Sequence, residues 1–130
     1  MVSGVSGPRF IGRQIMIGKY MTNSPTLKLI QTLDEIINIL QSDDETHWCD
    51  WMTKARDRLL HSDYSGVEYL LSAYGGMGSF NDLVICQSAV DGKFKWKDGY
   101  KEKNSRLDEL RQRAYELANG IKRNHEIVGS

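Results

Sequence analysis

The sequence predicts an all-α fold, a small bundle of four helices joined by short connections. Two observations predict it. Apolar residues recur at three- and four-residue spacing in four segments, and capping residues or glycine stand at the ends of these segments. A chain of 130 residues with 40% apolar content can bury one sizeable core, so we expect a single domain.

The first two helices are predicted over residues 24–41 and from about residue 46 to residues 61–63. Ser24 can cap the first helix and Pro25 suits its first turn. Residues 42–45, Ser-Asp-Asp-Glu, predict a capping box before the second helix. The expected buried stripes are Leu29, Leu33, Ile36, Ile37 and Leu40 in the first helix, and Trp48, Trp51, Met52, Ala55 and Leu59 in the second.

The third and fourth helices are predicted on either side of a less regular middle segment. The third is short, opens at Ser65, and has Gly75 as its C-terminal glycine. The fourth is expected to have Asn104 or Ser105 as its cap. Its C-terminal end is expected to begin at residues 119–120, Asn-Gly. Their inner faces are Val67, Leu70, Leu71 and Tyr74 in the third helix, and Leu107, Leu110, Ala114, Leu117, Ala118 and Ile121 in the fourth.

The middle segment, residues 83–97, predicts a short β-hairpin on the surface. Residues 91–92, Asp-Gly, are typical of a hairpin turn, and lysine alternates with aromatic residues over residues 93–97. Just before it, Ser79 stands three residues ahead of Asp82, which favours a short helical turn beginning at Phe80. Residues 83–85, Leu-Val-Ile, are β-rich in composition, so a strand there is the alternative.

The flanks divide the chain into three parts. Residues 1–23 are glycine-rich and free of acidic residues, which predicts a flexible N-terminal extension rather than a helix. It could be a tag, an upstream translation start or a genuine arm, and its glycines argue against a transit peptide. Residues 24–123 form the helical domain, and residues 124–130 are expected to be a frayed tail.

Composition excludes several classes of function. Seventeen basic residues balance seventeen acidic ones, so no overall field favours nucleic acid, and no stretch approaches the length of a membrane span. Two cysteines, Cys49 and Cys86, are too few for a disulfide framework, which predicts a cytoplasmic protein. Whether the chain forms a homo-oligomer stays open, because the stripe of the last helix suits either a partner copy or the interior of one bundle.

The candidate binding site is a glycine-rich octet between the third helix and the middle segment. Clustered glycine is unfavourable unless positive φ angles or a close approach require it. One interpretation is a tight chain reversal beside Trp48 or Trp51; the other is a loop whose free amides bind an anion or another ligand. The octet consists of Gly75, Gly76, Met77, Gly78, Ser79, Phe80, Asn81 and Asp82.

The sequence gives only weak signals for a nucleotide, metal, catalytic or aromatic binding site. The octet matches neither the P-loop nor the dinucleotide fingerprint and contains no lysine or arginine. The spacing of histidines and cysteines predicts no metal site, no catalytic residues stand out, and no cofactor is expected. Trp48 and Trp51, three residues apart, are interpreted mainly as core, with an aromatic binding platform as the alternative.

At the octet, the sequence resembles a family of small bacterial domains of unknown function. The residues that carry the resemblance are a Gly-Met-Gly-Ser turn, residues 76–79, running through Phe80 into Asn81, Asp82 and the apolar residues after them. The resemblance extends back through residues 48–71 and forward into residues 107–119, and residues 86–103 depart from its pattern. It implies a bacterial cytoplasmic origin and a mainly helical domain, but no activity.

Two hypotheses on function follow. The first is a non-enzymatic protein-binding module, similar in size and character to immunity proteins and small adaptors, with residues 75–82 and exposed parts of residues 43–51 as the contact surface. The second is a small-ligand or nucleotide-binding domain that uses the loop from Gly75 to Asp82, with Ser79, Asn81 and Asp82 as polar contacts; under this hypothesis an enzymatic activity stays open.

Overall fold

The computed structural model describes residues 24–75 and 78–129 of the chain. The predicted N-terminal extension, Gly76, Met77 and Ser130 lie outside the described residues. Along the chain the elements are helix α2 (Pro25–Ser42), helix α3 (Thr46–Leu60), helix α4 (Ser65–Leu71), the 3₁₀ turn η1 (Phe80–Asp82), strands β1 (Gln87–Val90) and β2 (Lys93–Trp96), and helix α5 (Tyr100–Gly129).

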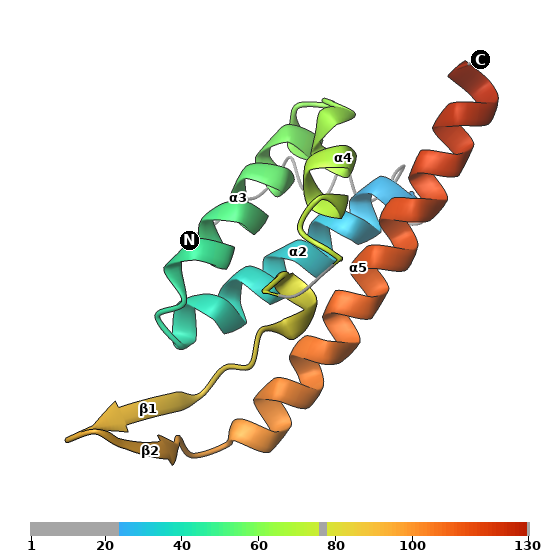
Figure 1. The fold of residues 1–130 in the computed structure, drawn as a ribbon. Helices are drawn as coiled ribbons and strands as arrows, with labels where there is room; N and C mark the ends of the chain where they lie inside the picture. The colour runs from blue at the N-terminus through green and yellow to red at the C-terminus, as the bar shows by residue number, and fades with distance from the viewer. Residues whose placement is uncertain (1–23, 76–77, 130) are drawn as a thin grey trace, which may run out of the picture.

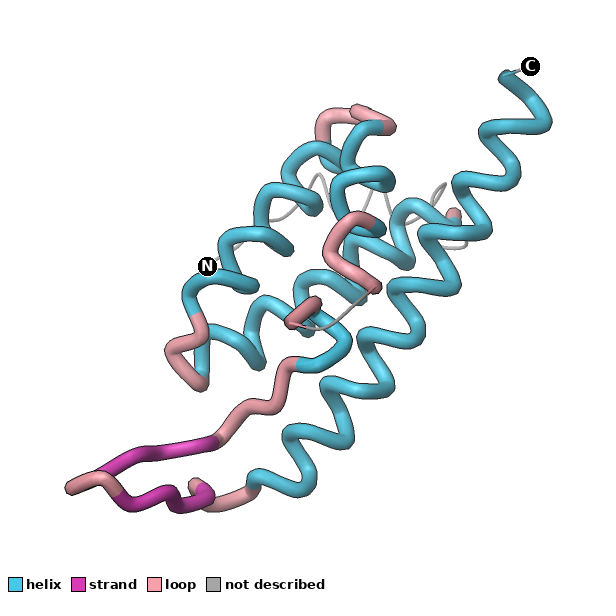
Figure 2. Tube along the Cα trace, viewed as in Figure 1, coloured by secondary structure: helices cyan, strands magenta, loops and turns pink. Residues whose placement is uncertain are grey.

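The three long helices lie side by side, with α2 between α3 and α5 (Figures 1 and 2). Helix α2 runs antiparallel to α5, since Leu27 near its start shares a groove with Ile121, whereas Glu35 further along pairs with Arg106. The short helix α4 packs against α3 and α5. The described part of the chain is therefore mainly helical, as the periodicity predicts, with one small antiparallel hairpin.

Helix α2 forms as predicted. The Oγ of Ser24 accepts a hydrogen bond from the backbone N–H of Leu27 at 3.4 Å, and Pro25 occupies the first helical position. The buried residues recur at helical spacing and form the central part of the core. They are Leu29, Ile30, Thr32, Leu33, Ile36, Ile37 and Leu40.

Helix α3 has a different cap from the predicted one. Ser42 is the last residue of α2, where its hydroxyl donates to the carbonyl of Ile39, so it cannot cap the next helix. Glu45 is the N-cap instead, and its carboxylate accepts from the N–H of Trp48 at 2.9 Å. An acidic side chain suits this position because it also faces the positive end of the helix dipole.

Helix α4 approaches α3 closely at Gly66. A Cβ at this position would lie 2.9 Å from the carbonyl oxygen of Ala55, closer than atoms can pack. The missing side chain therefore lets the two helices meet, and Val67 and Leu70 fill the space beside the contact. The helix ends at Leu71, so Gly75 lies four residues beyond its end rather than at its cap.

The hairpin forms where the turn signal predicts it. Residues 91 and 92 both have positive φ, 53° and 74°, which matches the type I′ turn that Asp-Gly favours. The strands pair in antiparallel register, with Ala89 opposite Phe94 and Gln87 opposite Trp96. Both strands lie on the surface, and they project from the end of the molecule where α5 begins (Figure 1).

Helix α5 is longer at both ends than the sequence predicts. It begins at Tyr100, four residues before Asn104, and the side chain of Asn104 bonds to the backbone of Ile85 rather than capping the helix. It also continues past Gly120 to Gly129, so residues 124–129, expected as a frayed tail, are helical. A stacking contact between Tyr64 and His125, with ring centroids 3.7 Å apart, holds this last part against the body.

Candidate functional site

The glycine-rich octet has the backbone geometry that the sequence predicts. Gly75 has φ +105° and Gly78 has φ +76°, both in the region that other residues rarely adopt. No atom lies within 4 Å of a Cβ built at either position, so conformation rather than crowding requires glycine there. The path of the described part of the loop is therefore set by its glycines.

Several backbone amides of this loop are already hydrogen-bonded within the protein. The N–H of Gly78 donates to the carboxylate of Asp82 at 2.8 Å, and that of Asn81 donates to the Oγ of Ser79 at 3.3 Å. The N–H of Phe80 donates to the carbonyl of Ala73 at 2.9 Å. These amides do not offer an anion the free donors that the ligand interpretation requires.

Phe80 places the loop against the tryptophan helix. Its side chain is fully buried, and its ring centroid lies 5.4 Å from that of Trp48. Trp51 stacks on Tyr69 at 4.8 Å, and its indole N–H donates to the Tyr69 carbonyl at 3.0 Å. Both tryptophans are half-buried and pack against the core, which favours their interpretation as core residues over a binding platform.

Arg111 holds the loop to α5, a role that the sequence analysis missed. Its guanidinium donates to the carbonyls of Phe80 at 2.7 Å and Leu83 at 2.8 Å, and it forms an ion pair with Asp108. The side chain is buried, although arginine is ordinarily exposed. A signal was present in the sequence, because Arg111 interrupts the apolar stripe one helical turn after Leu107.

Tyr74 adds a second link between the loop and α5. Its hydroxyl donates to the backbone carbonyl of Arg111 at 2.9 Å, and its ring meets Phe80 edge-on. Burial raises the pKa of the Tyr74 hydroxyl well above its ordinary value, so in the folded protein this group keeps its proton and its hydrogen bond to a higher pH than an exposed tyrosine does.

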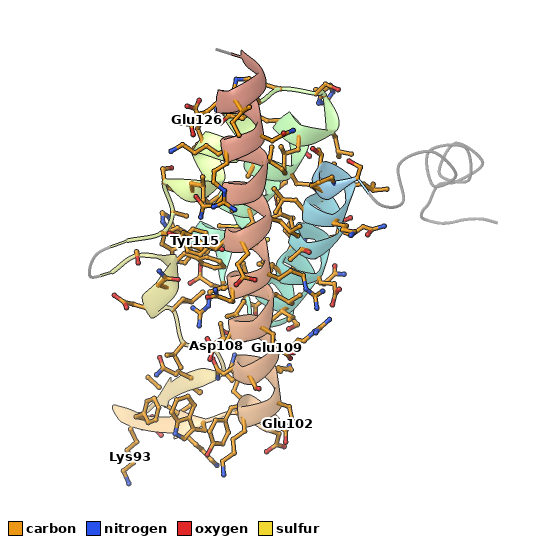
Figure 3. The ribbon with its side chains drawn as sticks, turned by 90° about the vertical axis from the view of Figure 1, so that its right-hand side faces the viewer. Lys93, Glu102, Asp108, Glu109, Tyr115 and Glu126 are labelled. Carbon is orange, nitrogen blue, oxygen red and sulfur yellow. The ribbon has the colours of Figure 1, made fainter. Side chains whose placement is uncertain are left out.

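Beside these contacts, a polar groove of about 510 Å³ is lined by residues of both the loop and α5. Its volume is that of a small-molecule site, but of the three predicted polar contacts only Asn81 is among the described residues that line it. Tyr115 borders this groove, and Figure 3 shows it on the loop side of α5. The described lining consists of Leu71, Tyr74, Gly75, Asn81, Gln112, Tyr115, Asn119 and Lys122.

The hairpin presents two chemically different faces. Residues directly opposite in an antiparallel pair lie on the same face. One side, which we call the aromatic face, consists of Gln87, Ala89, Phe94 and Trp96. The other, the lysine face, consists of Ser88, Val90, Lys93 and Lys95.

The aromatic face is open to solvent. Phe94 is 57% exposed and Trp96 is 38% exposed, and the two rings meet edge-on at 4.9 Å. Trp96 also stacks on Tyr100 at 4.5 Å, which ties the face to the first turn of α5. A groove of about 400 Å³ lies beside it, bordered by Trp96, Tyr100 and the 45% exposed Val84. The sequence predicts the hairpin, but it is the exposed fractions of Phe94 and Trp96 in the structure that make the hairpin a candidate site.

The cysteines are unsuited to nucleophilic chemistry. Cys49 and Cys86 are free and buried, and burial raises the pKa of both thiols. The reactive thiolate is therefore disfavoured at neutral pH. Within residues 24–75 and 78–129, no three histidine, cysteine, aspartate or glutamate side chains gather in a way that could hold a metal ion.

The described chain is thus a mainly helical domain with a solvent-exposed aromatic hairpin. Residues 41–93 match the family model of a domain of unknown function, DUF6966. The matched residues, less than half of the chain, run from the end of α2 to the start of β2; they include the octet and residues 86–93, and they stop before α5. No curated protein and no solved structure matches the chain.

Among the described residues, no helix combines the length and the apolar character needed to span a membrane.

Proposed function

We propose that this protein is a non-enzymatic protein-binding module and that the aromatic face of the hairpin is its contact surface. The observation that carries the proposal is the exposure of Phe94 and Trp96 on a hairpin that projects from the helical body (Figure 1). Aromatic side chains are enriched in the buried centres of protein interfaces, and tryptophan is prominent among the residues that dominate binding energy.

This surface replaces the one expected from the sequence, residues 75–82 with parts of residues 43–51. In the loop, Ser79 and Asp82 bond to local amides and Phe80 is buried. The side chain of Glu45 caps α3, and Trp48 packs against the core. These groups are already hydrogen-bonded or packed within the protein, whereas the aromatic face has exposed apolar surface that a partner could bury.

The proposed partner is a protein, rather than nucleic acid or a membrane, because the chain carries no net charge. We place the interaction in a bacterial cytoplasm, as the family resemblance suggests and as two free thiols support. An immunity protein or a small adaptor is the class that this proposal fits.

Photocrosslinking tests the proposal. We would place p-benzoyl-phenylalanine at position 94 on the aromatic face, and at position 116 as a control, where exposed Glu116 lies on α5 away from the hairpin. In cells of the organism that encodes the chain, we expect one saturable heteromeric adduct from position 94 and none from position 116. Equal adducts from both positions, or none from either, would contradict the proposal.

A small-ligand function is the second candidate, favoured by the volume of the polar groove between the loop and α5. A metabolite screen against thermal unfolding tests it, because a ligand that binds only the folded state raises Tm. A hit whose Tm shift is lost in Asn119→Ala, at a residue that lines the groove, together with no adduct from position 94, would favour this function over protein binding.

A further inference from the structure

The register of the hairpin determines which backbone groups point outward. The N–H of Lys97 donates to the carbonyl of Cys86 at 2.8 Å, so these two residues form a hydrogen-bonded pair. Hydrogen-bonded and non-hydrogen-bonded pairs alternate along an antiparallel ladder. The pairs Gln87 with Trp96 and Ala89 with Phe94 are therefore of the second kind, and their N–H and C=O groups point away from the partner strand.

Phe94 and Trp96 thus present both their side chains and their backbone groups at the outer edge of β2. Their side chains form the aromatic face, and their backbone groups are turned to the side where the two-stranded sheet has no further strand among the described residues. Every residue of β2 is exposed. An open edge of this kind is a template for an added strand.

The side chains of β2 define what such a strand should contain. A residue placed opposite Lys95 lies on the lysine face, and residues placed opposite Phe94 and Trp96 lie on the aromatic face. Lys93 lies at the tip and points away from the helices (Figure 3). Among the described residues neither Lys93 nor Lys95 has an ion pair, whereas Lys97 is paired with Asp43.

We propose that the partner adds an extended segment to the outer edge of β2 and that this segment alternates acidic and apolar residues. The inference rests on the proposed function and specifies its partner. Acidic residues would pair with Lys93 and Lys95, and apolar residues would cover Phe94 and Trp96 beside the groove of about 400 Å³.

Charge favours this occupant over a second copy of the chain. Residues 91–103 contain five lysines and three acidic residues in a chain that is neutral overall. Two β2 strands brought edge to edge would place lysines against lysines, and edge lysines are a common device against self-pairing. An acidic strand would instead place carboxylates against these lysines. It would also add a third strand to the two-stranded hairpin, which is only marginally stable in water.

Designed peptides test the inference with the full chain. A peptide as long as β2 that alternates Glu and Val is compared by calorimetry with one that alternates Lys and Val. We expect the Glu-Val peptide to bind about fivefold more tightly, the ratio that corresponds to about 1 kcal/mol, the upper end of what one favourable cross-strand pair supplies. Lys95→Glu should abolish that preference, because Lys93 still attracts the Glu-Val peptide while the new carboxylate repels it. Lys54→Glu, the same change of charge at an exposed site on α3, should leave the preference unchanged.

Amide hydrogen exchange locates the bound strand. The Glu-Val peptide should slow exchange at Phe94 and Trp96 and leave Gln87 and Ala89, on the outer edge of β1, as they are in the free protein. Equal affinity for both peptides, protection at Gln87 and Ala89 instead, or edge protection through self-association without peptide would each overturn strand addition.

The two proposals fail in different ways. If the adduct from position 94 persists in Lys95→Glu, and if Phe94 and Trp96 still exchange freely in the complex, strand addition is wrong and protein binding stands. If position 94 gives no adduct and neither peptide binds, both proposals are wrong.

Discussion

Gly78 and Gly120 differ in the backbone angle that decides how a side chain affects stability. Gly78 has φ +76°, whereas Gly120 lies within helix α5, and neither has an atom within 4 Å of a built Cβ. Gly78→Ala should therefore lower the free energy of unfolding by about 1 kcal/mol, because an L-residue is strained at positive φ, and Gly78→Val should lower it further. Gly120→Ala should raise it by up to about 1 kcal/mol.

Urea titration of the three variants against the unchanged protein measures both effects. Since neither site is crowded, a difference in sign between the two alanine variants isolates backbone conformation from packing. Loss of stability in both, or in neither, would contradict the role assigned to Gly78.

At the scale of single residues, the sequence predicts those features whose cause is local. The positive φ of Gly75 and Gly78 follows from the properties of glycine itself. The role of Arg111 could not be assigned in this way, because the two carbonyls to which it donates lie 28 and 31 residues away along the chain. The lining of the polar groove is likewise a product of tertiary structure, since its residues come from both the loop and α5.

The link between the hairpin and α5 belongs to the scale of elements. The side-chain oxygen of Asn104 accepts from the N–H of Ile85 at 2.9 Å, and its amide nitrogen donates to the Ile85 carbonyl at 3.0 Å. One side chain thus satisfies both backbone groups of a residue that leads into β1. This double contact fixes the base of the hairpin to the first turns of the helix.

Asn104→Ala should therefore lower the free energy of unfolding by about 2 kcal/mol, since it leaves two part-buried backbone groups without their partner. Asn119→Ala is the matched control, because the Asn119 amide makes only a solvent-exposed hydrogen bond, to the carbonyl of Tyr115 in its own helix; we expect a change within about 0.5 kcal/mol. Thermal or urea unfolding measures both, and equal losses in the two variants would contradict the tertiary role of Asn104.

The same residue explains where the prediction of elements went wrong. Asparagine and serine are good helix caps, so the sequence predicts that the last helix is capped by Asn104 or Ser105. In the structure Asn104 bonds to another element, and the helix begins at Tyr100 instead. Helices with clear periodicity and the turn at residues 91–92 were predictable; the ends of α5, which depend on distant contacts such as that of Tyr64 with His125, were not.

At the scale of the whole molecule, stability should fall in alkaline solution. Burial raises the pKa of Tyr74 above its ordinary value of 10.0 and raises those of Cys49 and Cys86 above 9.0. Above these ordinary values the unfolded chain loses protons that the folded chain still holds, so the free energy of unfolding falls as pH rises. The slope is about 1.4 kcal/mol per pH unit for each proton.

Tyr74→Phe separates the tyrosine from the cysteines. At pH 7 this variant should be less stable by about 1 kcal/mol, because it lacks the hydrogen bond to the Arg111 carbonyl. Above pH 10 its stability should fall less steeply than that of the unchanged protein. Parallel curves of unfolding free energy against pH in that range would show that Tyr74 does not carry the effect.

The two cysteines lie in different parts of the molecule, Cys49 on α3 and Cys86 at the base of the hairpin. Because both thiols are buried and protonated in the native state, a maleimide can react with them only after local opening. Mass spectrometry of the two alkylated peptides would then measure the rates at which the helical body and the base of the hairpin open, separately and without an engineered label. The two native cysteines thus act as separate reporters of opening in two parts of the protein.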